Sequence, residues 1–188
     1  WHIFLDSPMG IEATEVYARY RHLYETKLFG DGSDSPRLPN LHQTRTPEES
    51  MVINQVETGA IIIAGSGMCS GGRILHHLKH NVWRPQCHLV IVGFQAYGTL
   101  GRRIVDGAET IRLWGEEYRV RIRVHTIGGL SAHADQQDLL DWYRGFGNQP
   151  PVYLVHGEER AQSVLSGKLR DHGNLRVILP ERGQTIEI

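Results

Sequence analysis

Residues 128–159, GGLSAHADQQDLLDWYRGFGNQPPVYLVHGEE, place two histidines at junctions between regular elements. His133 lies just before a predicted helix, whose N-cap is Asp135 and whose next residues carry an apolar stripe. His156 follows the apolar run 151–155, which is typical of a buried parallel strand, and it precedes a second helix. In an open α/β sheet, ligands bind at the C-terminal ends of strands. A histidine at such a junction can simply cap backbone groups, but two of them favour a chemical role.

The same alternation of strand and helix extends toward the N-terminus. Apolar runs at 60–64 and 88–92 predict buried strands, and each is followed by a glycine-rich turn and a helix. Residues 2–5 predict a further strand, and residues 6–8, Asp-Ser-Pro, predict the start of a helix. This spacing is typical of a mostly parallel α/β sheet that is covered by helices.

The composition is ordinary for a globular protein, with 40% apolar and 22% charged residues in a chain of 188. No apolar run approaches the ~20 residues that span a bilayer. Cys69 and Cys87 form no CxxC pair, which predicts reduced cysteines and a cytoplasmic location. The chain opens Trp-His-Ile, without an initiator methionine or a basic leader, so we expect it to be part of a longer polypeptide.

Basic residues gather in the centre of the sequence. Residues 59–126 hold 9 Lys and Arg against 4 Asp and Glu, although the net charge of the chain is −1. Residues 118–125 alternate between apolar and basic side chains, which predicts one half-exposed strand with a cationic face. The candidate contacts for a polyanion are Arg119, Arg121 and Arg123 on this face, and Arg102 and Arg103 after a glycine-rich turn. Solvated arginines are the alternative interpretation.

Residues 65–72, GSGMCSGG, form a glycine-rich turn between a predicted buried strand and the start of a helix. Backbone N–H groups and the helix dipole at such a turn can bind an anion, and Ser66, Gly67 and Met68 are the candidate phosphate contacts. The turn is not the dinucleotide fingerprint GxGxxG, because Ser70 replaces the third glycine, and it lacks the lysine of a P-loop. A tight turn that needs glycine only for steric reasons is the alternative.

Three histidines lie on the helix that follows this turn. His76 and His80 are four residues apart on one face, the spacing that HExxH zinc sites use. The glutamate of that motif is absent, and no third ligand is evident. His76, His77 and His80 are therefore interpreted as partly exposed helix residues.

Taken in order, the motifs resemble the β-CASP branch of the metallo-β-lactamase-fold nucleases. This is the family of ribonuclease J and of the 3′-end-processing endonuclease of cleavage and polyadenylation factors. The motifs are DSPM at 6–9, AGSGMCSGGR at 64–73, GFQAYGTLGR at 93–102, SAHAD at 131–135 and VHGE at 155–158. The resemblance covers nearly the whole chain. It implies an N-terminally truncated β-CASP domain of Rossmann-like fold over 1–126, and the RNA-specificity segment of a metallo-β-lactamase αββα domain over 127–188.

The resemblance also implies an activity, the hydrolysis of phosphodiester bonds in RNA by an enzyme with two zinc ions. His156 would be a zinc ligand. His133 would protonate or stabilise the leaving 3′-oxygen. Ser131 would contact a phosphate, and Asp135 and Glu158 would support the two histidines.

The family's other zinc ligands lie in an HxHxDH motif and in residues after it, and HxHxDH does not occur in this sequence. One imidazole does not hold zinc at useful affinity, so we expect this chain alone to hold no zinc and to be inactive. Its expected partners are RNA and the missing N-terminal half of its own chain. Homodimerisation is left open, and no membrane contact is expected. A non-catalytic RNA-binding or scaffolding relative is the alternative, which the presence of both His133 and His156 disfavours.

Overall fold

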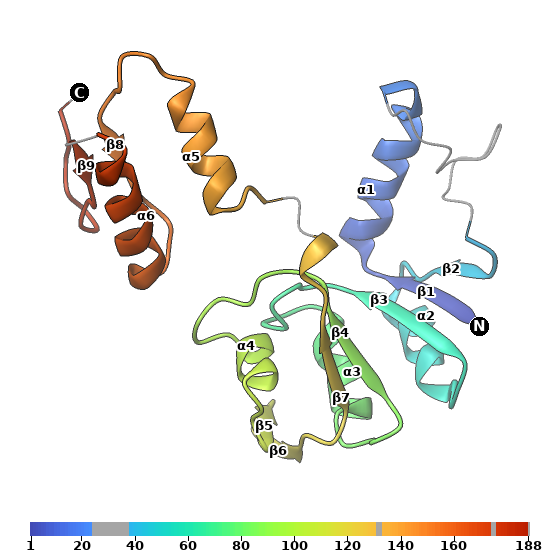
Figure 1. The fold of residues 1–188 in the computed structure, drawn as a ribbon. Coiled ribbons are helices and arrows are strands. Elements are labelled where there is room, and N and C mark those ends of the chain that lie inside the picture. The colour runs from blue at the N-terminus through green and yellow to red at the C-terminus, as the bar shows by residue number, and fades with distance from the viewer. Residues whose placement is uncertain (24–37, 131–132, 174–175, 188) are drawn as a thin grey trace. The chain divides into compact units, whose positions relative to one another are not determined.

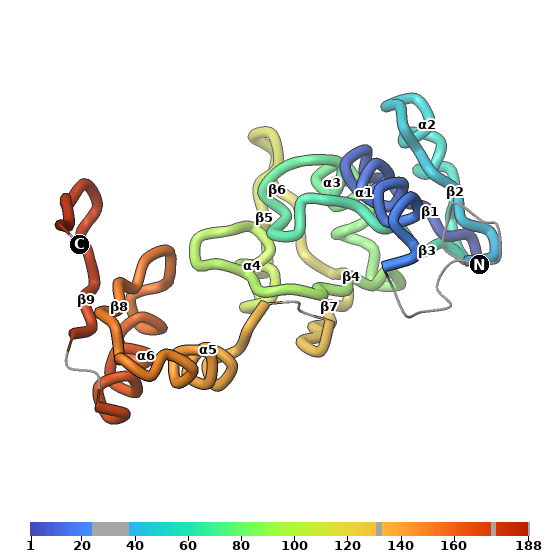
Figure 2. The backbone as a smooth tube through the Cα atoms, turned by 90° about the horizontal axis from the view of Figure 1, so that it is seen from above, coloured from blue at the N-terminus to red at the C-terminus, as the bar shows by residue number. Residues whose placement is uncertain are grey.

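The computed structural model describes residues 1–23, 38–130, 133–173 and 176–187. The chain forms two compact units, Trp1–Leu130 and Ser131–Ile188 (Figures 1 and 2). The boundary falls just before the sequence SAHAD, so His133 and His156 both belong to the second unit. Within the described ranges, no helix is long and apolar enough to cross a membrane.

A three-stranded parallel sheet forms the N-terminal part of the first unit. β1 (His2–Asp6) lies between β2 (Leu41–Gln43) and β3 (Ala60–Ala64), as Figure 1 shows. The strands predicted over 2–5 and 60–64 are thus confirmed. Asp6 and Ala64 are partners in the register and end their strands together. Residues that follow β1 and β3 therefore start from the same C-terminal edge of the sheet.

Local capping decides where the helices around this sheet begin. The elements are α1 (Pro8–Arg19), the 3₁₀ turn η1 (Arg21–Leu23), α2 (Pro47–Val52) and the 3₁₀ turn η2 (Ile53–Gln55). The Ser7 hydroxyl accepts a hydrogen bond from Gly10 N (3.2 Å), which caps α1 where the sequence predicts a helix start. Thr46 and Glu49 form a reciprocal capping box at the start of α2.

The remainder of the first unit comprises α3 (Ile74–Asn81), β4 (His88–Ile91), α4 (Leu100–Val105), β5 (Thr110–Leu113), β6 (Glu116–Arg119), β7 (Arg123–Thr126) and the 3₁₀ turn η3 (Gly128–Leu130). β4 pairs with β7 in parallel, and β5 and β6 form an antiparallel hairpin. Leu78, Val82, Ile104 and Ile111 are fully buried in one cluster that joins the helices to these strands. Each such side chain contributes about 1.5–3 kcal/mol when it is buried.

The prediction of one strand over 118–125 is wrong. Between β6 and β7, the backbone N–H groups of Arg121 and Ile122 both donate to the carbonyl of Val82, at 2.8 and 2.9 Å. This carbonyl follows the end of α3, and the two bonds draw the chain away from the hairpin and into the parallel pair. The alternation in the sequence reflects burial instead, because Ile122 is buried and the arginines on either side of it are exposed.

In its described residues, the second unit contains two helices and one pair of strands: α5 (Gln136–Arg144), β8 (Val152–Tyr153), α6 (Glu159–Asp171) and β9 (Val177–Ile178). β8 and β9 pair in parallel over a small buried cluster of Leu140, Tyr143, Leu169 and Val177. The strand expected over 151–155 is parallel, as predicted, but it is only two residues long. In the described residues the chain is therefore mixed α/β with parallel sheet pieces, and one continuous sheet is not formed.

Candidate functional site

The 65–72 turn follows β3 at the C-terminal edge of the sheet, and its ends are joined by backbone contacts. The N–H group of Ile74, at the start of α3, donates to the carbonyl of Gly65 (3.0 Å). Gly72 has a left-handed φ of +71°, and a Cβ at this position would lie 2.6 Å from the same carbonyl oxygen. Conformation and space both require glycine here. The steric explanation of the glycines therefore holds for Gly72.

The outer part of the turn offers backbone N–H groups to a ligand. Ser66, Gly67 and Met68 are exposed, and the N–H groups of Gly67 and Met68 make no hydrogen bond within the described residues. The carbonyls of the same two residues are already occupied, by Gln95 Nε2 (2.8 Å) and by Gly101 N (3.0 Å). Neighbouring N–H groups that precede a helix can donate to the oxygens of one anion.

Gln95 locks this turn to the glycine-rich turn that follows β4. Its side chain is 6% exposed, and Nε2 also donates to Phe94 O (3.1 Å). Gly101 leaves room for this amide, because a Cβ there would lie 1.8 Å from Gln95 Oε1. Sequence reasoning gave no role to Gln95 or Gly101. The sequence signal that could have indicated this contact is a glutamine among closely spaced glycines in residues 93–102.

A buried carboxylate lies at the same edge of the sheet. Asp6 ends β1 and is 0% exposed. Its oxygens contact Thr44 Oγ1 (2.5 Å), Ser50 Oγ (2.7 Å), His77 Nε2 (2.6 Å) and the Arg73 guanidinium. Burial alone raises the pKa of Asp6, but the hydrogen bonds from Thr44, Ser50, His77 and Arg73 outweigh it and hold the pKa below its ordinary value. Because the carboxylate is ionised and only accepts, His77 Nε2 carries the proton.

Arg73 connects this carboxylate to the 65–72 turn, which it follows directly in the chain. In addition to the Asp6 carboxylate, its guanidinium donates to the carbonyls of Thr44 (2.6 Å) and Arg45 (2.7 Å). Breaking a buried pair of this kind costs about 3–5 kcal/mol, because one charge is left without its partner. The cluster therefore fixes the end of the turn and the start of α3 against β1.

Sequence reasoning missed the cluster. From the sequence, Asp6 is predicted only as part of a helix start. The prediction of a partly exposed His77 is wrong, because the residue is 5% exposed and bound to Asp6. The available signal was a carboxylate at the end of an apolar strand, since such a side chain is almost never fully buried without a partner. No local pattern could identify Arg73 and His77 as those partners.

The arginines of the 118–125 segment do not share an edge with the turn. β4 and β7 are parallel, and Arg123 lies opposite His88 at the start of both strands. Arg119 and Arg121 precede it, and both are exposed. The 65–72 turn is instead braced against the segment that follows the end of β4. Four strand residues span roughly 10 Å, so the arginines and the turn belong to opposite edges of the first unit.

Arg102 and Arg103 lie on α4, whose residue Gly101 contacts the turn. Arg102 Nε is 2.8 Å from Asp106 Oδ2 in an exposed ion pair, which lowers the charge it presents. Arg103 is exposed. Of the five candidate arginines, these two are on the element that adjoins the turn.

His133 and Asp135 lie at the start of α5. His133 is exposed, and Asp135 caps the helix by accepting from Asp138 N (2.9 Å), while Asp138 Oδ2 accepts from Asp135 N (3.0 Å). The prediction of Asp135 as N-cap is confirmed. Ser131 lies outside the described residues.

His156 and Glu158 lie between β8 and α6. His156 is exposed and has a φ of +59°, a conformation that few residues other than glycine adopt and that histidine adopts more readily than most. Glu158 occupies the N-cap position of α6. The catalytic role of His133 and the zinc-binding role of His156 stay predictions.

The described residues do not by themselves form a zinc site. No three His, Cys, Asp or Glu side chains among them are grouped so that they could hold a metal ion, and zinc takes three or four protein ligands. Cys69 is no substitute, because burial raises the pKa of its thiol. The chemistry that these residues offer is anion binding by N–H groups and proton transfer by exposed imidazoles.

The fold and these motifs define a class of protein. Residues 1–104 match the Beta-Casp domain, and residues 117–180 match the Zn-dependent metallo-hydrolase RNA specificity domain. The chain belongs to the β-CASP family of metallo-β-lactamase-fold RNA nucleases.

Several relatives are similar over nearly the whole chain, and two of them differ in their names. A ribonuclease of Thermus thermophilus is 39% identical over 189 residues, which cover 99% of this chain and 43% of the relative. Transcription termination factor FttA of Pyrococcus abyssi is 32% identical over 197 residues, which cover 99% of this chain and 30% of the relative. The chain thus spans less than half the length of either protein.

Proposed function

We propose that this chain supplies the RNA-binding turn and two active-site histidines of a zinc-dependent ribonuclease. The observation that carries the proposal is the pair of exposed N–H groups at Gly67 and Met68, which make no hydrogen bond within the described residues. Gln95 donates to the carbonyl of Gly67, and Arg73, directly after the turn, anchors its end to Asp6. Donors that are already in place need no reorganisation when an anion binds, which makes them effective in a site for phosphate.

Proton transfer is assigned to His133. An imidazole can exchange a proton near neutral pH, and its position before the capped start of α5 leaves the ring exposed to a substrate. His156 is assigned as one ligand of a zinc ion whose other ligands come from outside the described residues. Ser131 is assigned to a phosphate. The match to a Zn-dependent metallo-hydrolase domain and the similarity to a ribonuclease support these assignments.

A factor that binds RNA without cutting it is the second candidate. One observation favours it: a relative is named a transcription termination factor. In such a protein the turn would still bind phosphate, and the two histidines would have no catalytic role.

Cleavage of RNA separates the two candidates. The intact protein, supplied with zinc, is incubated with an end-labelled single-stranded RNA and with DNA of the same sequence. We expect zinc-dependent cleavage of the RNA, which a chelator abolishes. Binding of the RNA without cleavage, in protein shown by elemental analysis to contain zinc, would establish the second candidate instead.

A further inference from the structure

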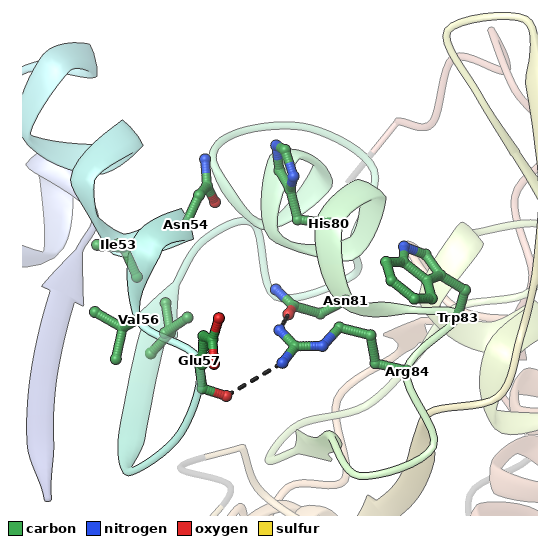
Figure 3. A pocket seen from close by; sticks show the side chains of 9 residues that line it. Ile53, Asn54, Val56, Glu57, His80, Asn81, Trp83 and Arg84 are labelled. Atoms are coloured by element: carbon green, nitrogen blue, oxygen red, sulfur yellow. Dashed lines mark hydrogen bonds between the residues drawn. The ribbon is translucent and has the colours of Figure 1, made fainter.

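A cavity of about 490 Å³ opens at the other edge of the first unit, away from the 65–72 turn. It lies between η2, the residues that lead into β3, and the C-terminal end of α3 (Figure 3). Ile53, which is buried, is one of three aliphatic side chains in its lining. The volume is within the range of ~300–1,000 Å³ in which protein sites hold small ring-containing ligands.

Two side chains beside the cavity suit a flat ligand. Arg84 donates to Asn81 Oδ1 (2.8 Å) and to the carbonyl of Glu57 (3.1 Å), and Figure 3 shows its guanidinium reaching across the cavity toward Glu57. The guanidinium is therefore fixed, with three of its five N–H donors still available. Trp83, the neighbouring residue, lines the cavity and is 52% exposed, so a large aromatic side chain is accessible there.

The charges around the cavity favour a neutral ligand over an anion or a metal ion. The positive Arg84 is balanced by the negative Glu57. Burial lowers the pKa of His80, and His77, Lys79 and His76 lower it further, so its ring is neutral at pH 7. A neutral imidazole offers one donor and one acceptor, and the amide of Asn54 offers both kinds of group.

The exposed arginines run beside this cavity. Arg121 N donates to the carbonyl of Val82, and Arg123 N donates to the carbonyl of Cys87 (3.0 Å). The arginine segment is therefore bonded to both ends of the 82–87 loop that carries Trp83 and Arg84. A sugar–phosphate backbone that contacts the arginines would carry its bases past the cavity.

We propose that the cavity takes an unpaired nucleobase of single-stranded RNA, with the base stacked on Trp83 and its edge facing Asn54 and His80. Arg121 and Arg123 contact the phosphates on either side. Every base has an aromatic face, so stacking of this kind tolerates many sequences. The inference rests on the proposed function in that it takes RNA as the ligand, and it adds a contact at the edge opposite the 65–72 turn.

The test compares two probes that carry the same number of phosphates: a short oligoadenylate and an abasic oligoribonucleotide of equal length. The unmodified protein should bind the oligoadenylate more tightly. Trp83→Ala should remove roughly 5- to 100-fold of that preference, the usual effect of losing a stacking residue, and it should leave the affinity for the abasic probe and the salt dependence unchanged. Trp83→Phe should retain most of the preference. Trp142→Ala removes an exposed tryptophan of the other unit and should have no effect.

The outcomes separate this inference from the proposed function. Equal affinity of the unmodified protein for both probes, or an equal loss for both in Trp83→Ala, overturns the base site. If RNA is still cleaved in that case, the proposed function stands. If the protein neither binds nor cleaves RNA, the proposed function fails, and the base site fails with it.

Discussion

The two units hold their candidate functional groups in opposite ways. In the first unit, the groups proposed to bind phosphate are backbone N–H groups of the 65–72 turn, and buried side chains hold that turn: Gln95 at its outer part, and Asp6 through Arg73 at its end. In the second unit, His133 and His156 are exposed side chains on a unit with a small core. The 65–72 turn is therefore held in place by groups of this chain, whereas the roles proposed for the two histidines require groups beyond its described residues.

Replacement of His133 gives the largest expected effect and tests the second unit. In the intact protein, His133→Ala should slow RNA hydrolysis by about 10²–10⁴-fold, the usual contribution of a positioned general acid. RNA affinity should not change, because the 65–72 turn belongs to the other unit. Single-turnover rates and equilibrium titrations measure the two effects. His172→Ala removes another exposed histidine of the second unit and should leave the rate unchanged.

Zinc content distinguishes the two proposed roles. His156→Ala should lower the zinc bound by the intact protein and abolish turnover, whereas His133→Ala should leave the zinc content near normal. Elemental analysis after dialysis gives both values. An equal loss of zinc in the two variants would show that His133 is itself a ligand.

Removal of the Asp6 carboxylate tests how much the buried cluster contributes to the free energy of unfolding. Asp6→Ala should lower the free energy of unfolding by about 3–5 kcal/mol, because it leaves the Arg73 guanidinium without its charged partner. Glu15→Ala is the matched control, since it breaks an exposed pair with Arg45 and should cost at most about 1 kcal/mol. Urea unfolding of the chain measures both. Equal losses in the two variants would contradict the role of the cluster.

The pH dependence gives the same prediction a second readout. Because the pKa of Asp6 is lowered in the folded protein, the contribution of the carboxylate is complete above the ordinary value of 3.8. It is lost as the pH falls below that value through the pKa of the folded state. Asp6→Ala should therefore flatten the acid limb of the stability curve. An acid limb that is unchanged in the variant would mean that other carboxylates cause it.

A methyl group at Gly101 tests the brace between the two turns. Gly101→Ala places a Cβ 1.8 Å from Gln95 Oε1 and 3.0 Å from Met68 O, so the Gln95 amide must move away from Gly67. We expect a loss of about 1–3 kcal/mol in stability, as in other overpacked sites, and weaker binding of RNA. Gly93→Ala is the control, because its Cβ would have nothing within 4 Å. Unchanged RNA affinity in Gly101→Ala would show that the brace does not serve binding.

The smallest effect on RNA binding is expected from Arg119, Arg121 and Arg123, because these side chains are exposed and are not held in place as the 65–72 turn is. Single Arg→Gln changes at 119, 121 or 123 should each reduce the slope of log affinity against log salt by at most ~0.7, the value for one phosphate contact to a single strand. Titrations at several salt concentrations measure the slope. If the triple variant keeps the slope of the unmodified chain, the three arginines are merely solvated.

Features that depend on a few adjacent residues could be predicted from the sequence. The cap at Asp135 is one, because one side chain and the next turn of helix decide it. The sequence could not show that the 118–125 segment breaks, because the acceptor that breaks it is the Val82 carbonyl, nearly forty positions away. It could not show the burial of His77 either, because the cause is a carboxylate 71 residues earlier. What the sequence misses is the pairing of distant polar groups.

The Asp6 cluster also has a consequence for the order in which the chain folds. Its partners are 38 to 71 positions away from Asp6, so the bonds form only after β1, α2 and α3 have come together. Contacts of such long range are costly to close early, and we expect them to be absent from the transition state. Asp6→Ala should then accelerate unfolding while it hardly changes the rate of folding, which stopped-flow measurements would show. The contacts of the Asp6 carboxylate would thus form late in folding and break early in unfolding, so they slow unfolding more than they speed folding.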